Sequence, residues 1–261
     1  MSKPDFAKAT TDKPNFVHLH VHSHYSLLDG LGKVPELVGR AKELEMPALA
    51  ITDHGVMYGA IEFYLECQKQ DIKPIIGVEA YVARRKMSDK TAGEDIKPYH
   101  LLLLAKNFQG YQNLIKLTSA AHLDGYYYKP RIDRDLLSRH HEGLIATTAC
   151  LASETSRLIE NKDFKGLNET VGEYSEIFGK DNYYLELQHH PSIPEQQVLN
   201  THLKDLAVKT GLPLIATNDV HYVNSNDSVA HDQLICIQTG KLVSDTDRMV
   251  YGGDFSLKTP Q

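Results

Sequence analysis

The chain has 261 residues, of which 41% are hydrophobic, and a formal net charge of −6 at pH 7. This length suffices for one large barrel or two ordinary domains, and the negative charge is unusual for a nucleic-acid-binding protein unless bound cations offset it. No apolar run reaches the roughly 18 residues of a membrane span, and the polar first residues lack the apolar core of a secretory signal. We therefore expect a cytoplasmic protein with no membrane partner, whose three cysteines stay reduced.

Strand-like apolar runs alternate with helical patterns from residue 16 onward. The predicted strands are residues 16–23, 48–54, 74–82, 100–105, 143–150, 183–188 and 212–221. Helical spacing follows Gly32, and a later helix is expected to begin at Pro194 and end at Gly211. Most of the strands are continuous apolar runs, which is typical of a parallel sheet buried on both faces. The sequence therefore predicts an α/β fold, a (β/α)7 TIM-like barrel of seven strands, one unit short of the usual eight.

The first predicted strand carries a histidine at every second position. These histidines are His18, His20, His22 and His24. Alternate residues of a strand point to one face, so the imidazoles share one side of the strand and the apolar residues between them share the other. Neutral imidazole is the commonest metal ligand in proteins, and the apolar residues in between argue against a tag-like surface tract. This strand is therefore predicted to contribute to a metal site.

Further side chains that can bind metal lie late in other strands or directly after them. They are Asp53, His54, Glu79, Cys150, Asp219 and His221. The carboxyl ends of the strands and the loops after them build the active sites of α/β barrels, so these residues are expected to meet at one rim. Glu79 stands alone in an apolar strand, where a bare carboxylate costs several kcal/mol unless it is paired or metal-bound. Between two cations it would be a bridging ligand.

Five segments resemble the polymerase and histidinol phosphatase (PHP) domain family. They are residues 16–23, 26–30, 50–55, 73–79 and 216–221. The form of the domain that opens the alpha subunit of bacterial DNA polymerase III is similar also at residues 99–107, 125–133 and 255–260. The resemblance covers residues 16–261, leaves residues 1–15 as an N-terminal extension, and implies that the chain ends before a downstream polymerase core.

The resemblance implies a distorted seven-stranded barrel that holds up to three divalent metals. The implied ligands are His20, His22, Glu79 and Asp219 for the first metal, Glu79, His100 and Cys150 for the second, and Asp29, His54 and His221 for the third. The imidazole, carboxylate and thiolate donors favour zinc, with manganese or iron as alternatives. His100 begins its predicted strand and so lies at the wrong end for the rim, which leaves His122 as the rival ligand.

The implied activity is metal-dependent phosphodiester hydrolysis, as a 3′–5′ proofreading exonuclease on DNA. Asp219, His54 and Glu79 are the expected catalytic residues, and Lys129 and Arg131 the expected substrate contacts. The implied partners are a DNA 3′ end, the polymerase core of the same subunit and other replisome subunits. Two alternatives remain open: a small-molecule phosphatase of the histidinol phosphate type, and a non-catalytic scaffold that docks a separate proofreading subunit.

Smaller motifs are assigned structural roles. The pairs His140-His141 and His189-His190 are interpreted as surface residues, although the second pair follows a predicted strand and could border the rim. Cys67 and Cys236 are expected to pack in the core.

Overall fold

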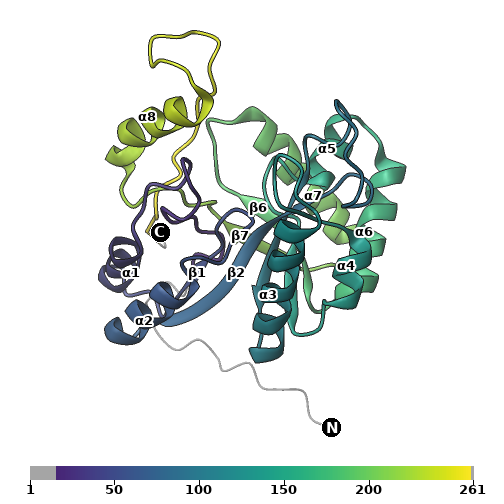
Figure 1. Ribbon diagram of the computed structural model, residues 1–261, viewed down its shortest axis with the longest axis horizontal. Coiled ribbons are helices and arrows are strands. Elements are labelled where there is room, and N and C mark those ends of the chain that lie inside the picture. Colours follow the sequence, from purple (N-terminus) through teal and green to yellow (C-terminus); the bar gives the residue numbers. More distant parts are fainter. Residues whose placement is uncertain (1–15, 260–261) are drawn as a thin grey trace.

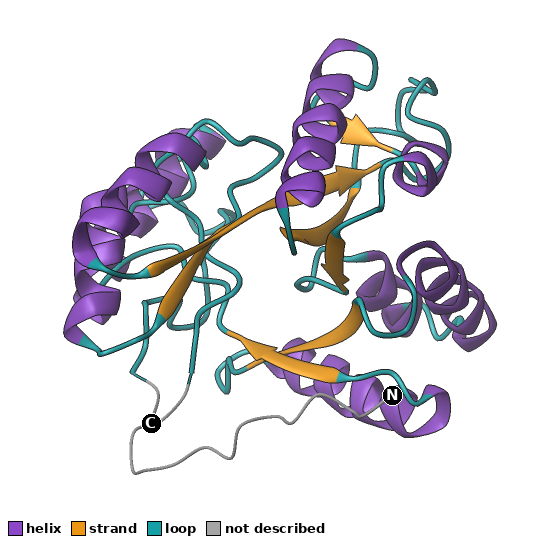
Figure 2. Ribbon diagram, turned by 90° about the horizontal axis from the view of Figure 1, so that it is seen from below, coloured by secondary structure: helices purple, strands orange, loops and turns teal. Residues whose placement is uncertain are grey.

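The computed structural model describes residues 16–259 and shows a sheet that curls around a central axis, with helices on its outside (Figures 1 and 2). The strands are β1 (Ala48–Ile51), β2 (Lys73–Val82), β3 (Tyr99–Ala105), β4 (Arg131–Ile132), β5 (Leu144–Thr147), β6 (Tyr183–Gln188) and β7 (Leu214–Thr217). The helices are α1 (Val34–Glu43), α2 (Ala60–Gln70), α3 (Phe108–Leu123), α4 (Arg134–Arg139), α5 (Glu154–Glu160), α6 (Phe164–Phe178), α7 (Pro194–Thr210) and α8 (Ser228–Thr239), with a short 3-10 helix η1 (Ser225–Asp227). The α/β barrel-like fold is as predicted, and residues 1–15 lie outside the described part.

The strand order is β1-β2-β3-β5-β6-β7, with the short β4 paired to β2. Neighbouring strands are parallel except at β3, which is antiparallel to both β2 and β5. The expectation of a wholly parallel sheet is therefore wrong at this strand. The cause lies in residues 83–98, which form a polar connection without a helix, whereas a parallel return needs a crossover that is usually helical.

The first predicted strand, residues 16–23, makes only one isolated bridge instead of a regular ladder. Its backbone nevertheless bonds to both sides. The Ala50 amide in β1 donates to the His18 carbonyl at 3.0 Å, and the Val220 amide, after β7, donates to the His20 carbonyl at 3.0 Å. Residues 16–23 therefore lie between the two edges of the curled sheet and join them, and we call them the closing segment.

Two apolar clusters hold the helices against the sheet. The larger one packs α3, α6 and α7 on β2, β3, β5 and β6, with Leu103, Leu114 and Leu203 fully buried. The smaller one packs α1 and α2 against β1 and residue Val21 of the closing segment. Helix α7 ends as predicted, because Gly211 follows it with φ of +72°, a left-handed conformation that glycine adopts at little cost.

The two ends of the barrel differ in chemistry. At the end where the parallel strands begin lies a mainly apolar cavity of about 840 Å³, lined by residues such as Leu19, Ile75 and Ile215. None of the described residues that line it is a histidine, a cysteine or a carboxylate.

No helix within residues 16–259 has both the length and the apolar character that crossing a membrane requires.

Candidate metal centre

At the opposite end of the barrel, the residues predicted for the first metal converge. His20 Nε2 lies 3.3 Å from Glu79 Oε1 and 3.2 Å from Asp219 Oδ1. His22 Nε2 lies 3.3 Å from Glu79 Oε2 and 3.3 Å from Asp219 Oδ1. Two nitrogens and two carboxylates, from the closing segment, β2 and the end of β7, thus face one small volume.

The second predicted group adjoins the first through Glu79. Glu79 Oε1 lies 3.0 Å from His100 Nδ1 and 3.3 Å from the Cys150 sulfur, which is 3.5 Å from His100 Nδ1. His100 reaches this rim because β3 runs antiparallel, so its first residues lie where the parallel strands end. His122 does not join the group: its Nε2 lies 3.2 Å from the Gly55 carbonyl.

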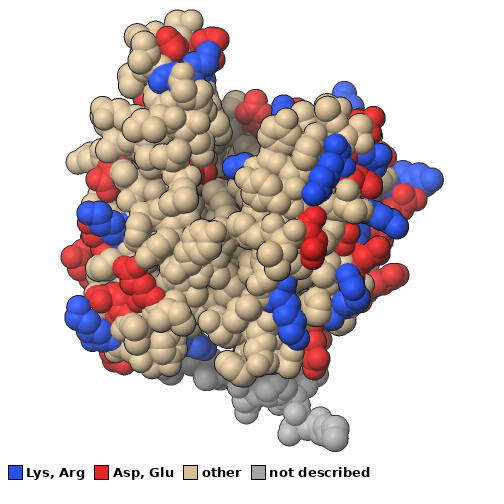
Figure 3. Space-filling model, viewed as in Figure 1, with Lys and Arg blue, Asp and Glu red and all other residues tan. Residues whose placement is uncertain are grey.

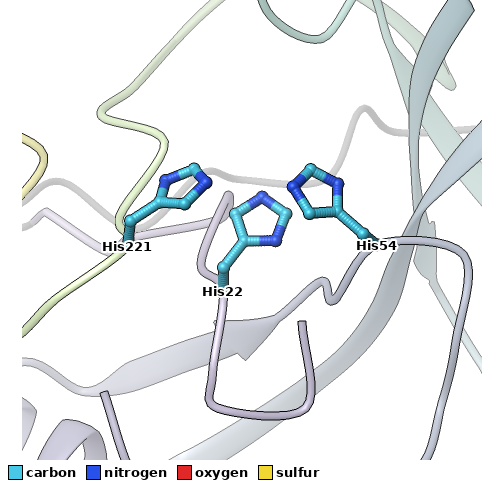
Figure 4. Close-up of side chains that lie close together, drawn as sticks. All are labelled: His22, His54 and His221. Atoms are coloured by element: carbon cyan, nitrogen blue, oxygen red, sulfur yellow. The ribbon is translucent and has the colours of Figure 1, made fainter. Parts of the chain in front are cut away.

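The third predicted group lies on the other side of His22. His54 Nε2 is 2.8 Å from Asp29 Oδ2, and His221 Nε2 is 3.8 Å from Asp29 Oδ1. The His22 ring stacks between the rings of His54 and His221, with centroid distances of 4.0 and 4.4 Å (Figure 4). All nine predicted ligand residues therefore lie in one continuous cluster.

Three of the imidazoles, those of His20, His22 and His221, are held through Nδ1 and point Nε2 into the cluster. His20 Nδ1 bonds to Glu186 at 2.8 Å, His22 Nδ1 to the Ser26 hydroxyl at 2.9 Å, and His221 Nδ1 to the Asp219 carbonyl at 2.8 Å. Partners of this kind fix the ring and leave the second nitrogen available as a metal ligand. Six buried atoms of the cluster make no well-aligned hydrogen bond, although the third and fourth of them lie 2.8 Å apart: His20 Nε2, His22 Nε2, His54 Nδ1, Glu79 Oε2, Asp219 Oδ1 and His221 Nε2. Buried imidazole nitrogens and carboxylate oxygens of this kind are suitable ligands for divalent cations.

The electrostatics of the cluster also fit bound cations. Burial disfavours the charged form of Glu79, but His100 and His20 beside it hold the pKa of its carboxyl well below the usual range. Burial likewise opposes a charge on His20, yet Asp219 and Glu79 outweigh it and raise the pKa of that imidazole. Burial, with Glu79 nearby, raises the pKa of the Cys150 thiol. Without a metal, His20 and Cys150 therefore hold protons. A bound cation would displace these protons, since metal ligands must be deprotonated.

Comparison with known proteins agrees with this geometry. The model of the PHP domain family matches residues 18–190. The chain belongs to the PHP domain family. The DNA polymerase III subunit alpha of Borreliella burgdorferi is 47% identical over 238 residues, which are 91% of this chain and 21% of that protein. The same subunit of Treponema pallidum is 46% identical over 251 residues, 95% of this chain and 21% of that protein.

This PHP domain therefore spans about a fifth of the length of the curated relatives it matches. Among solved structures, it is similar to histidinol phosphate phosphatase from Lactococcus lactis, which was crystallised with zinc, L-histidinol and phosphate. That likeness has a TM-score of 0.43 at 13% identity and covers 87% of this chain and 94% of the other.

Glu186 in β6 is a functional candidate that the sequence reading missed. It is fully buried, and besides His20 Nδ1 it accepts hydrogen bonds from the hydroxyls of Thr147 and Thr217. The available signal was the one used for Glu79, a lone carboxylate in an otherwise apolar strand. Glu186 contacts His20 at Nδ1, the nitrogen that faces away from the cluster, so it supports a ligand and is not placed as one.

Strained turns position three of the clustered side chains in this PHP domain. Leu28 precedes Asp29 and has φ of +62°, and Ala149 precedes Cys150 and has φ of +54°. Asp219 itself has φ of +51°. Residues other than glycine in this region cost of order 1–3 kcal/mol each, and such strain concentrates at functional sites. The fold therefore tolerates unfavourable backbone where it aims these side chains inward.

A cavity of about 630 Å³ opens onto the cluster. It corresponds to the rim between the α8 side and the α5–α7 side of the molecule, where Figure 3 shows a furrow bordered by mostly uncharged surface. Lys129 lines the cavity and has its ammonium 5.3 Å from the centre of the Tyr81 ring. His190 lines it too and is buried, so it is not a surface residue, whereas His189 is exposed.

Arg131 does not face this cavity. Its guanidinium is fully buried and donates to the backbone carbonyls of Gly125, Met87, Asp89 and Asp95. The expectation that Arg131 contacts substrate is therefore wrong, because its donors are used to hold together the loops around β4.

Proposed function

We propose that this PHP domain hydrolyses phosphodiester bonds at DNA 3′ ends, as a metal-dependent 3′–5′ exonuclease. The observation that carries the proposal is the convergence of nine metal-capable residues, six of which each have a buried ligand atom that makes no well-aligned hydrogen bond. Membership of the PHP family supports metal-dependent phosphoester chemistry. The relatives named DNA polymerase III subunit alpha support DNA as the substrate.

Three divalent ions would be held by the nine residues of the cluster. The proposed sets are His20, His22, Glu79 and Asp219; Glu79, His100 and Cys150; and Asp29, His54 and His221. Glu79 is assigned to two sets because it lies between them: Oε1 is near both His20 and His100, and Oε2 is near both His22 and His54. A sulfur ligand at Cys150 favours zinc in the second set, while manganese or iron also suits the imidazole and carboxylate donors.

When bound, such ions supply activated water and neutralise phosphate charge. The chain's own residues would then orient the reacting groups. Glu79 fixes the spacing of the first two sets, and Asp219 or His54 would accept the proton released during hydrolysis. Lys129, exposed at the edge of the cavity, would contact a phosphate oxygen with a charge-assisted hydrogen bond.

The partners follow from the same proposal. The DNA 3′ end, single-stranded or mismatched, would be the substrate. A downstream polymerase core in the same polypeptide would deliver it, and other replisome subunits would bind the complete protein in the cytoplasm. These assignments rest on relatives that are about five times longer than this chain.

The test combines metal analysis with nuclease assays on the purified chain. We expect the zinc- or manganese-loaded chain to release deoxynucleoside monophosphates from labelled DNA with a mismatched 3′ end, and His22→Ala or Asp219→Ala to abolish this release. His24→Ala is the matched control, because His24 lies two residues after His22 but packs on Tyr25 outside the cluster. Undiminished cleavage by the His22→Ala, Asp219→Ala double variant would refute the assignment.

Histidinol phosphate in the same assay separates the alternatives. Rapid hydrolysis of histidinol phosphate, while the DNA remains uncleaved, would favour a small-molecule phosphatase. Metal binding with no hydrolysis of either compound would favour a scaffold.

A further inference from the structure

The cavity beside the metal cluster has an apolar wall that hydrolysis of a phosphate ester does not itself require. Ile193, Met249, Val250 and Phe255 contribute to this wall, and they come from two separate segments, the β6–α7 loop and the chain after α8. Met249 and Val250 are 52% and 58% exposed, although both are apolar. The wall is continuous with the cluster, because Asp29, Cys150, Asp219 and His221 line the same cavity.

Buried polar atoms without partners lie in this wall. His190 and Gln196 line the cavity and are each 1% exposed. Neither ring nitrogen of His190 has a hydrogen-bond partner among the described residues, and neither does Gln196 Oε1. The His190 ring stacks on Phe255 at a centroid distance of 4.2 Å, which fixes its plane. Buried polar groups normally find partners, so these atoms indicate a ligand that supplies them.

We propose that this region, comprising Ile193, Met249, Val250, Phe255, His190 and Gln196, is a subsite for the base of the 3′-terminal nucleotide. A nucleobase has apolar faces and an edge of donors and acceptors, which matches an apolar wall with few fixed polar groups. The inference rests on the proposed function, because the scissile phosphate must lie at the cluster for the adjoining base to reach this wall. Stacking tolerates any base, as a proofreading site requires.

The test compares two probes that share a phosphate and a sugar and differ in the base. These are deoxyadenosine 5′-monophosphate and deoxyribose 5-phosphate, titrated calorimetrically into the zinc-loaded chain. We expect the nucleotide to bind roughly ten-fold tighter or more, the range that stacking of one base gives. The Met249→Ser, Val250→Ser double variant should bring the two affinities close together, and His190→Phe should reduce their ratio by removing both ring nitrogens while keeping the ring on Phe255.

The matched control is Leu242→Ser with Val243→Ser. These residues belong to the same segment after α8 and are 68% and 54% exposed, but they do not line the cavity. The control should retain the wild-type ratio. Equal affinity of the wild-type chain for the two probes would overturn the subsite, as would an unchanged ratio in the Met249→Ser, Val250→Ser variant.

A nuclease assay separates failure of the subsite from failure of the proposed function. Strands that end in an intact nucleotide or in an abasic one are compared at their 3′ ends. Equal rates of release of the 3′-terminal residue from the two strands would agree with the exonuclease activity and overturn the subsite. Tight, base-dependent binding without release from either strand would support the subsite and refute the exonuclease.

Discussion

Replacing Glu186 with glutamine tests how the barrel prepares a metal ligand. Glu186 Oε1 accepts from His20 Nδ1 at 2.8 Å, from Thr217 at 2.5 Å and from Gln188 at 3.1 Å, while Oε2 accepts from Thr147. A glutamine whose oxygen replaces Oε1 keeps the first three bonds. Its amide group then faces the Thr147 hydroxyl, which can rotate to accept. The substitution therefore removes a charge while it preserves shape and the number of hydrogen bonds.

The expected effect is selective. The carboxylate makes the His20 imidazole a better electron donor, and loss of such a supporting partner typically weakens metal affinity about 10–100-fold, or about 1.4–2.7 kcal/mol. Because the bonds are conserved, the free energy of unfolding of the metal-free chain should change by less than about 1.5 kcal/mol, the net value of one ordinary hydrogen bond.

Zinc affinity is measured by competition with a chelator of known affinity, and unfolding by urea titration after metal removal. Glu154→Gln is the matched control, because Glu154 is also a glutamate of low exposure, at 15%, but bonds to Arg134 and Tyr174, away from the cluster. This control should bind zinc as the wild type does. A folded Glu186→Gln chain with unchanged zinc affinity would refute the reasoning that Glu186 tunes His20.

Three other outcomes are expected. Zinc at a free concentration of 100 times its dissociation constant should raise the free energy of unfolding by about 2.7 kcal/mol. Removal of zinc with EDTA should therefore lower the Tm measured by calorimetry. An unchanged Tm would contradict zinc binding to the folded cluster. Burial lowers the pKa of His190 from 6.5 to about 4, so the unfolded chain gains a proton first as pH falls. The contribution of the neutral ring to the free energy of unfolding is complete above pH 6.5 and is lost as the pH falls toward 4, by up to about 3 kcal/mol. Urea titrations across this pH range measure the loss, and His190→Phe should remove this part of the pH dependence. Burial raises the pKa of Cys67 to about 12, so iodoacetamide at pH 8 should modify it only in the unfolded chain, as mass spectrometry would show.

Local patterns predicted much of the fold because they depend on nearby residues. The boundaries of β6 and the start of α7 at Pro194 agree with the sequence reading. The direction of β3 was not predicted, because an apolar run such as residues 100–105 carries no sign of its orientation. The relevant information lay in the connection before it, whose lack of a helical pattern permits only a short return.

The candidate site shows the same division between local and distant information. Spacing within one strand indicated His20 and His22, and the family resemblance supplied His100 against the apparent strand direction. Basic residues gave no such guidance, because a guanidinium can serve loop carbonyls as well as phosphates, and Arg131 does the former. The supporting role of Glu186 depends on a contact between residues 166 positions apart, which no local pattern contains.

The closing segment links the stability of the barrel to its chemistry. Residues 16–23 join the edges of the sheet through four backbone hydrogen bonds, to Ala50, Thr52 and Val220, and form no regular ladder. The same segment carries His20 and His22, whose free nitrogens face Glu79 and Asp219 from other strands. Cations bound there would tie this segment to β2 and to the residues after β7 by coordination, in place of the protons that the imidazoles hold without them. Folding and metal binding should therefore be coupled most strongly at the point where the barrel is least regular.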